Sequence, residues 1–351
     1  MSWAELPLFS VRLLDWWDIH GRKDLPWQHP RTPYRVWVSE IMLQQTQVTT
    51  VIPYFEKWMS AFPDIRSLAK APLDDVLAHW AGLGYYARAR NLHKTARLCM
   101  EQFGGALPVS PDDLCALPGI GLSTANAIIS QSTGQPAAVL DGNVRRVLAR
   151  HAAVDGWTGK SEVQKRLWLE AEDRLPETRG DDYTQAVMDL GATLCTRTRP
   201  DCGTCPVNAD CLALTNSRVE ELPTPKPRAK VSEQDVYMLV VRDNEGRVLL
   251  EKRPPSGIWG GLWCLPSGPG HEEALAALGV ESAKSQSLPV IDHRLSHIRM
   301  TIYPSLITAI EGTQVKCTSN LGWFSTSKQS ELGLPKPVND LLVKLKNGEF
   351  K

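Results

Sequence analysis

Four cysteines that lie close together in the chain are the clearest set of residues that could do chemistry. Cys195, Cys202, Cys205 and Cys211 follow the pattern Cys-x6-Cys-x2-Cys-x5-Cys, which is short enough for one loop to gather four thiolates around one centre. Zinc also binds four cysteines, but its usual ribbons and fingers use two close pairs, and here only Cys202 and Cys205 form such a pair. The spacing therefore predicts a metal site and favours an iron-sulfur cluster over zinc only slightly.

A carboxyl group at Glu40 is placed where it could act as an acid. On a helix Glu40 shares a face with Val36, Trp37 and Leu43, and desolvation among such apolar side chains raises the pKa of a carboxyl group. A glutamate with a raised pKa can donate a proton near neutral pH. The alternative is a glutamate on the rim of the helix, held by a salt bridge, which is the commoner fate of this residue type.

A second carboxyl group, Asp141, precedes a helix that begins in the segment Gly-Asn-Val and has apolar residues Val144, Val147 and Leu148 at helical spacing. Asp141 suits the N-cap of this helix, and a cap typically contributes about 1 kcal/mol, so its residue type alone does not indicate catalysis. A catalytic role requires a partner acid. Glu40 is the partner that we predict.

A glycine-bearing turn, Leu117-Pro-Gly-Ile-Gly121, lies between two helical patterns and predicts a helix-hairpin-helix over residues 112–130. Gly119 and Gly121 allow a tight turn that leaves amide groups at a helix N-terminus free to hold a phosphate, where the helix dipole also favours an anion. An ordinary glycine-rich helix connection is the alternative. Together with the cysteine loop, the turn favours binding of the DNA backbone, which does not depend on the base sequence.

The chain has 351 residues, which predicts two or three domains. Helical periodicity covers residues 6–222, and three prolines with three basic residues then suggest an extended connector. We expect a mainly α domain over residues 1–221, with its metal loop at 195–211. A linker over 222–234 and a mixed α+β domain over 235–349 should follow, with strands near 236–242, 247–252 and 301–307.

The overall composition is that of an ordinary folded protein, with 42% hydrophobic and 22% charged residues. Basic and acidic residues balance at 39 each, so a nucleic-acid partner would have to be bound by local patches. No stretch reaches the roughly 18 apolar residues of a membrane span, and residues 1–10 do not read as a targeting segment. We therefore expect a cytoplasmic protein with no membrane contact.

Taken together, these segments resemble the endonuclease III superfamily of helix-hairpin-helix glycosylases, and within it the MutY family of adenine DNA glycosylases. The resemblance covers nearly the whole chain. Its strongest elements are the ordered cysteines and the segments at 39–48, 82–93, 117–121 and 140–144. It implies a [4Fe-4S] cluster on the four cysteines, base-excision repair of double-stranded DNA with adenine opposite 8-oxoguanine or guanine, and a monomeric, bacterial-type protein acting at the nucleoid.

The resemblance also implies roles for individual residues. Glu40 would protonate adenine at N7, and ionised Asp141 would stabilise the positive charge that develops on the sugar. Asn143 would help to orient them, and Asp189 would support the site from behind. Ser123 stands where strand-cutting relatives carry a lysine, and a hydroxyl group cannot form a Schiff base. We therefore expect hydrolytic base release without efficient strand cleavage.

Adenine within a duplex must be flipped out to reach Glu40, so other residues are expected to fill the gap and hold the strand. By the resemblance, Gln45 and Tyr85 are the wedge and stacking residues, and Leu43 lies near the same minor-groove surface. Tyr86 is expected in the core. Basic side chains along two helical stretches suit phosphate contact: Arg88, Arg90, Lys94, Arg145, Arg146 and Arg150.

The C-terminal region resembles the Nudix-like domain of the same family, including the segment at 254–266. The metal-binding helix of Nudix hydrolases is replaced by residues 270–279, which have too few properly spaced carboxylates for magnesium, so a binding role is favoured. Ser296 and His297 match a Phe-Ser-His loop that senses 8-oxoguanine, whereas Leu295 replaces the aromatic residue. That change puts the strength of discrimination between 8-oxoguanine and guanine in question.

Three rival functions are weighed against this interpretation. A strand-cutting lyase acting on oxidised pyrimidines would share the hairpin and cluster, but Ser123 argues against it. A non-catalytic iron-sulfur protein that binds DNA or senses redox state would need neither Glu40 nor Asp141. A phosphohydrolase acting through the C-terminal domain would need a metal site that residues 270–279 do not offer.

Overall fold

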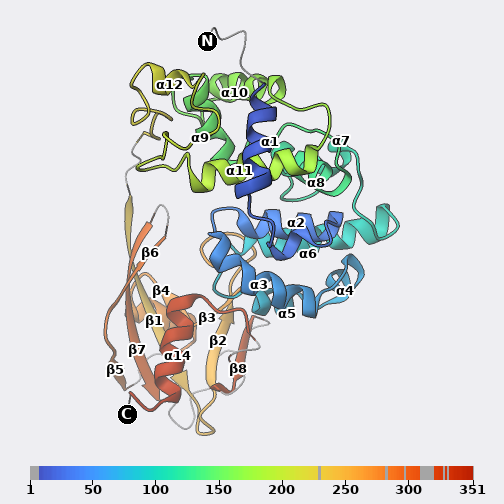
Figure 1. Cartoon of the computed structure of the whole chain (residues 1–351). Helices are drawn as coiled ribbons and strands as arrows, with labels where there is room; N and C mark the ends of the chain where they lie inside the picture. The colour runs from blue at the N-terminus through green and yellow to red at the C-terminus, as the bar shows by residue number, and fades with distance from the viewer. Residues whose placement is uncertain are drawn as a thin grey trace. The chain divides into compact units, whose positions relative to one another are not determined.

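The computed structural model describes residues 8–227, 231–280, 284–295, 298–308, 320–326, 329 and 332–350. The chain divides into two compact units, which Figure 1 shows coloured along the sequence. The first unit comprises Met1–Lys70 and Asn91–Arg228, and the second comprises Ala71–Arg90 and Ala229–Lys351. The expected fold class, a mainly α core with an α+β C-terminal region, is confirmed, whereas the expected domain boundaries stay a prediction.

The first unit is built almost entirely from helices, and capping residues mark where several of them begin. Thr32 accepts a hydrogen bond from the Arg35 N–H ahead of Pro33, and Ser110 accepts one from Asp113 N–H ahead of Pro111. The elements are α1 (Phe9–His20), η2 (Pro26–Gln28), α2 (Pro33–Leu43), α3 (Val48–Ala61), α4 (Ile65–Lys70), α7 (Pro111–Cys115), α8 (Leu122–Thr133), α9 (Gly142–His151), α10 (Ser161–Asp173), α11 (Gly180–Thr193) and α12 (Leu212–Thr215). Helix α6 (Ala87–Gln102) begins in the second unit and ends in the first.

The predicted hairpin is present as α7, a glycine turn and α8. Gly119 has φ +81°, and a Cβ there would lie 2.9 Å from the Asn91 Nδ2, so both conformation and space require glycine. Gly121 is the N-cap of α8 and provides no side-chain cap, which leaves the first-turn N–H groups of α8 without that partner. The turn thus has the form that can hold an anion.

One apolar cluster joins α1, α9, α10 and α11 in the core of the first unit, with Leu13, Val147, Leu167 and Leu190 fully or almost fully buried. Helix α11 approaches α9 closely because residue 191 is a glycine. A Cβ at Gly191 would lie 2.7 Å from the Cβ of Asn143. The N-terminal end of α9 is therefore held tightly against α11.

The second unit contains one mixed sheet, drawn in orange and red in Figure 1. The central strands β1 (Ser232–Arg242) and β7 (Ile298–Thr308) are parallel, in the register Val236 to Ile302. All other pairs are antiparallel, and the strand order is β3-β2-β1-β7-β5, with β4, β6 and β8 pairing to β1, β7 and β2. The remaining bounds are β2 (Val248–Lys252), β3 (Trp263–Cys264), β4 (Ser267–Gly268), β5 (Ser285–Ser287), β6 (Ile291–Arg294), β8 (Leu321–Phe324), α13 (His271–Ala277) and α14 (Lys336–Lys346).

Apolar side chains of β1 point alternately to the two faces of the sheet, which explains why helices cover both faces. Met238 and Val240 belong to an apolar cluster with Leu341 and other residues of α14. Leu239 and Val241, which point to the opposite face, belong to a second cluster with Leu275 and other residues of α13. Helix α5 (Leu73–Trp80) also belongs to this unit, although the residues on both sides of Ala71–Arg90 belong to the first.

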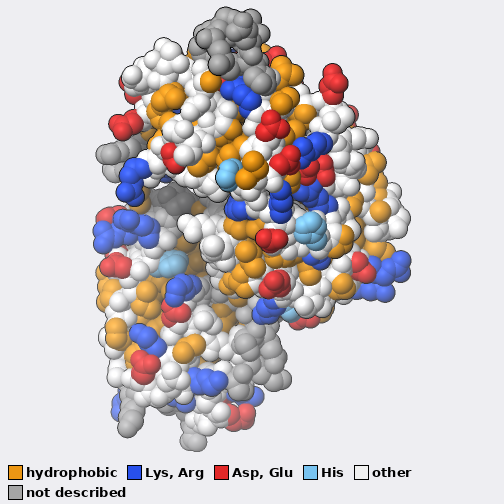
Figure 2. All heavy atoms as spheres, in the orientation of Figure 1, with side chains coloured by type: hydrophobic (Ala, Val, Ile, Leu, Met, Phe, Trp, Pro, Cys, Tyr) orange, Lys and Arg blue, Asp and Glu red, His pale blue; other side chains and the backbone are white. Residues whose placement is uncertain are grey.

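Charged side chains of both signs are interspersed over the helices of the first unit on the face shown in Figure 2. This distribution agrees with the equal numbers of basic and acidic residues, 39 of each. Among the described helices, none combines the length and the apolar composition that crossing a bilayer requires.

Replacing Gly191 with alanine should destabilise the first unit, because the new methyl group would collide with Asn143 and force α11 away from α9. We expect a loss of about 1 to 3 kcal/mol in the free energy of unfolding, measured by urea denaturation. Gly142→Ala is the matched control, since a Cβ at that neighbouring position meets nothing within 4 Å. Equal stabilities of the two variants would contradict the close approach of the two helices.

Candidate functional site

A cavity of about 520 Å³ in the first unit brings the two predicted acids together. Glu40 enters it from α2, while Asp141 and Asn143 enter it at the N-terminal end of α9. Its size falls within the range of small-molecule sites. The other lining residues come from the segment around η2, the turn before α3, the end of α11 and the loop that follows: Arg22, Leu25, Trp27, Leu43, Thr46, Gln47, Val48, Thr49, Arg146, Gln185, Met188, Gly191, Ala192, Thr196 and Arg197.

Glu40 is held in an environment that favours its protonated form. Withdrawal from solvent raises its pKa from 4.5 to about 7, and the negative charge of Asp141 contributes to the rise. Gln131 on α8 donates a hydrogen bond of 2.9 Å from its Nε2 to the Glu40 Oε1, which partly offsets the rise. Glu40 can therefore carry a proton at neutral pH and give it up to a group in the cavity.

Asp141 has a different environment, because it caps α9. Its Oδ1 accepts a hydrogen bond of 2.7 Å from the Val144 N–H. Burial raises the pKa of Asp141, but the backbone N–H groups of Val144 and Asn143 and the charges of Arg146 and Arg145 all oppose that rise. These donors favour the carboxylate form of Asp141, and its negative charge in turn contributes to the raised pKa of Glu40.

Arg146 fixes the position of Asn143 and the start of α9. Its Nη2 donates to the Asn143 Oδ1 at 2.8 Å and to the Gly191 carbonyl at 2.6 Å, and its Nε donates to the Cys195 carbonyl at 2.7 Å. The side chain therefore connects α9, the end of α11 and the cysteine loop. Its guanidinium group is used within the protein, although it also lines the cavity.

Asp189 supports the cavity without lining it. The side chain is buried, with 1% exposed area, and accepts hydrogen bonds from the Arg22 backbone and guanidinium group at 2.6 to 2.9 Å. It also accepts hydrogen bonds from the Gln185 Nε2 at 2.8 Å and the Trp17 Nε1 at 3.2 Å. Because Arg22 and Gln185 do line the cavity, Asp189 orients two of its polar walls.

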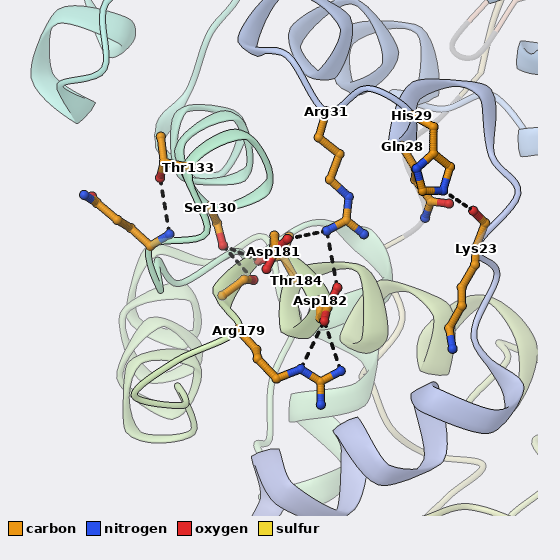
Figure 3. Close-up of polar contacts among 12 residues, drawn as sticks. Lys23, Gln28, His29, Arg31, Ser130, Thr133, Arg179, Asp181, Asp182 and Thr184 are labelled. Carbon is orange, nitrogen blue, oxygen red and sulfur yellow. Dashed lines mark hydrogen bonds and ion pairs between the residues drawn. The ribbon is translucent and has the colours of Figure 1, made fainter.

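A polar network behind the site holds α8 against the N-terminal end of α11 (Figure 3). The buried Ser130 hydroxyl donates to the Gly180 carbonyl at 2.8 Å and lies 2.9 Å from the Thr184 Oγ1. On the outer side Arg31 pairs with Asp181 and Asp182 at 2.6 and 3.3 Å. Since Gln131 follows Ser130 directly, this network also fixes the donor that contacts Glu40.

The four predicted metal ligands line one cavity, which is separate from the site of the two acids. Arg150 on α9, only 3% exposed, donates to the Cys195 Sγ at 3.4 Å and to the Thr196 carbonyl at 2.7 Å. Within the described residues no three His, Cys, Asp or Glu side chains are grouped so that they could hold a single metal ion.

The residues predicted to contact DNA in the first unit lie at different places. Leu43 lines the cavity, and Gln45, exposed with φ +59°, lies in the turn between α2 and α3. Gly119 and Gly121 form the hairpin turn. The Ser123 hydroxyl accepts a hydrogen bond of 2.9 Å from Leu140 N–H, so it steadies the residue before Asp141.

Tyr85 and Arg88 belong to the second unit. Tyr85 is 49% exposed and has φ +48°, a conformation that a bulky aromatic residue rarely adopts. Arg88 is only 8% exposed and donates to the Leu83 and Gly84 carbonyls at 3.1 and 3.2 Å. The Arg88 guanidinium group therefore stabilises the turn that contains Leu83 and Gly84 and is not available as a free cation. Arg146 and Arg150 behave likewise in the first unit.

Ser296 and His297, the residues predicted to sense the lesion, lie outside the described residues. Leu295, which replaces the aromatic residue expected there, is described. It packs against the apolar cluster beneath α14, and its N–H donates to the Ile298 carbonyl at 2.9 Å.

Sequence reasoning missed Gln131 and Arg22. Gln131 follows Ile128, Ile129 and Ser130 on an apolar helix, and a buried amide of this kind signals a polar partner elsewhere in the chain. Arg22 gave no signal, because its contact with Asp189 joins residues that are 167 positions apart.

The comparisons with known proteins agree with this geometry. Residues 38–172 match the model of the HhH-GPD superfamily of base excision DNA repair proteins, and residues 237–344 match the NUDIX domain. Adenine DNA glycosylase of Buchnera aphidicola subsp. Baizongia pistaciae is 35% identical over 342 residues, covering 97% of each chain. The chain belongs to the adenine DNA glycosylase family. The human member is also 35% identical, over 88% of this chain and 68% of its own length.

Solved structures of glycosylases show the same helical fold. A thermostable thymine-DNA glycosylase is 27% identical and superposes with a TM-score of 0.53, over 59% of this chain and 95% of that one. Endonuclease III in a non-covalent DNA complex is 20% identical, with a TM-score of 0.51 over 59% of this chain and 94% of that one. The helix-hairpin-helix core predicted by the motifs is therefore confirmed.

Replacing Glu40 with glutamine should change stability in a pH-dependent way. Relative to the wild type, the variant should become more stable as the pH rises. In the wild type the unfolded carboxyl group ionises near 4.5 and the folded one near 7, so unfolding releases a proton in that window and stability falls as pH rises. The variant has no carboxyl group at this position and therefore lacks this loss of stability. The difference in the free energy of unfolding between the variant and the wild type should therefore be larger at pH 8 than at pH 4, by at most about 3 kcal/mol.

The measurement is urea denaturation at the two pH values. Glu56→Gln, which removes an exposed carboxyl group from α3, is the control and should show no such difference. An equal effect of both substitutions at both pH values would mean that Glu40 ionises like a surface glutamate.

Proposed function

We propose that this protein is a monofunctional DNA glycosylase that removes adenine mispaired with 8-oxoguanine or guanine from double-stranded DNA. The observation that carries the proposal is the pair Glu40 and Asp141 in one cavity, with the pKa of Glu40 raised to about 7. Family membership supports adenine as the base that leaves, because the curated relatives are adenine DNA glycosylases.

Release of adenine needs an acid, because the base is a poor anionic leaving group. Glu40 donates its proton to adenine N7, which weakens the N-glycosidic bond, and the base departs with the bonding electron pair. Asp141, whose carboxylate form is favoured by the donors at the start of α9, stabilises the positive charge on the sugar. Water then adds to the sugar and gives up a proton, which the Glu40 carboxylate can take back to restore the acid.

The walls of the cavity supply the remaining contacts for an extruded base. Trp27 offers an aromatic surface, while Arg22 and Gln185, oriented by Asp189, offer hydrogen-bond donors. Asn143 is held by Arg146 beside Asp141 and orients groups near the sugar. Extrusion is favoured at a mispair, because a mispaired base costs less to unstack than a paired one.

The protein is expected to leave the DNA strand intact. Cleavage by related lyases requires an amine that forms an imine with the sugar, and Ser123 has only a hydroxyl group, which is engaged by the Leu140 N–H. Base release therefore leaves an abasic site that only later treatment, such as alkali, converts to a break.

Contacts outside the cavity are proposed from the same resemblance. Gly119 and Gly121 hold a phosphate on the first turn of α8, where amide groups lack a side-chain cap. Leu43, Gln45 and Tyr85 occupy the space around the extruded base, and Arg88 supports Tyr85. Ser296 and His297 recognise the opposite 8-oxoguanine.

The four cysteines are proposed to hold a [4Fe-4S] cluster. The donor set fits, since four thiols line one cavity and Arg150 donates an N–H to the Cys195 sulfur, which stabilises a thiolate. The resemblance to the MutY family, more than the cysteine spacing, supports a cluster over zinc. When bound, the cluster supplies a covalent crosslink of the loop, which Arg146 and Arg150 connect to α9.

The direct test uses a labelled duplex with one A:8-oxoguanine pair, analysed before and after alkali under single-turnover conditions. We expect strand breaks only after alkali, and Glu40→Gln should lower the rate of base release by at least about 100-fold while the Kd for the duplex changes little. Glu56→Gln, an exposed carboxyl group, is the control and should retain the wild-type rate.

Breaks formed without alkali would contradict the monofunctional mechanism and favour a lyase. Full activity of Glu40→Gln would assign the acid to another residue. Release from an A:T duplex at the same rate would contradict recognition of the mispair.

A further inference from the structure

The segment Ala71–Arg90 is part of the second unit, although the chain on both sides of it belongs to the first. It contains α5, the turn Gly82–Tyr86 and the first residues of α6. The C-terminal domain thus forms one compact body with a piece of chain that is distant in sequence.

Three attachments tie the segment to residues after 229, one near its beginning and two near its end. Asp74 on α5 pairs with Lys252 on β2. The Tyr86 hydroxyl donates to the Leu334 carbonyl at 3.2 Å, and Arg90 donates from Nη1 to the Gly260 carbonyl. These contacts fix the segment along its length.

Close packing accompanies the polar contacts. A Cβ at Gly333 would lie 2.9 Å from the Cβ of Leu77, so the backbone after the sheet lies directly against α5. A Cβ at Gly261 would lie 3.5 Å from Cδ of Arg90. The segment and the C-terminal residues therefore meet as packed surfaces.

The turn held in this way carries Tyr85 in a strained and exposed conformation. Its φ of +48° costs an aromatic residue free energy and persists only where the surroundings impose it. Internal contacts impose part of it: Trp80 donates to the Gly84 carbonyl at 2.9 Å, and the Arg88 guanidinium lies 5.1 Å above the Trp80 ring and 5.6 Å above the Tyr85 ring. Tyr86, anchored on the C-terminal side, is the next residue.

We propose that the C-terminal domain presets Tyr85 for contact with DNA, with Tyr86 and Asp74 as positioning residues that act through the turn. The domain thereby contributes to recognition of the mispair by a route independent of residues 295–297. The proposal rests on the proposed function, since that function is what places Tyr85 beside the extruded base. The attachment itself can be tested without DNA.

The first experiment measures hydrogen exchange of the peptide spanning residues 82–90 in the full-length protein without DNA. Tyr86→Phe and Asp74→Asn should each increase exchange about fivefold, the effect of losing one hydrogen bond or partly buried ion pair. Tyr303→Phe removes the same hydroxyl from a tyrosine stacked on Tyr237, and Asp75→Asn removes a charge from the same turn of α5. Neither control should change exchange of this peptide, and equal effects of variants and controls would overturn the attachment.

The second experiment is a double-mutant cycle on the Kd for the A:8-oxoguanine duplex. Tyr86→Phe should weaken binding about fivefold in the wild type and have no further effect in a Tyr85→Ala background, because its action passes through Tyr85. An equal loss in both backgrounds would overturn the positioning role. If the wild type fails to release adenine while exchange responds as expected, the proposed function fails and the attachment stands.

Discussion

Two carboxyl groups that share a partly dehydrated cavity cannot both be ionised at low cost, and the rest of the site follows from how this protein resolves that conflict. The start of α9 stabilises negative charge through its N–H groups and dipole, and Asp141 occupies that position. At Glu40, desolvation and the charge of Asp141 raise the pKa to about 7, and the amide of Gln131 offsets that rise only in part. In the proposed mechanism, this helix end thus separates a proton donor from a charge stabiliser, the two groups that release of a neutral base requires.

The surrounding structure keeps this helix end in place. Gly191 allows α11 to approach Asn143, and Arg146 connects the same point to the cysteine loop. Behind α2, the buried contact of Ser130 with Gly180 fixes the helix that carries Gln131. The partly buried Arg146 and the close approach at Gly191 therefore determine the geometry of the acids, although neither residue is expected to touch the reacting bond.

Much of the fold and of the site could be predicted from the sequence, because the signals are local. The glycine turn at 117–121, the cap at Asp141 and the apolar face around Glu40 each depend on neighbours within one or two helical turns. What could not be predicted depends on contacts between distant residues. Arg22 and Asp189 are 167 positions apart, and basic side chains that suited DNA phosphates, such as Arg88 and Arg150, donate to backbone carbonyls inside their own units.

Local sequence patterns also could not predict that Ala71–Arg90 belongs to the second unit. Hydrophobic periodicity identifies α5 as a helix but does not indicate which unit it packs against. Tyr86 is an example of a residue whose contacts local patterns do not predict. The sequence placed it in a core, whereas the structure leaves it partly buried, with a hydrogen bond from its hydroxyl to the Leu334 carbonyl that spans 248 positions.

The most direct test of this account is the titration of Glu40 itself, by NMR of protein labelled with 13C at the glutamate carboxyl carbons and assigned with Glu40→Gln. We predict a pKa of about 7 for Glu40 in the wild type and a lower pKa in Asp141→Asn, which keeps a capping side chain but removes the neighbouring charge. A Glu40 carboxyl group that titrates near 4.5, or one that does not respond to Asp141→Asn, would contradict this account.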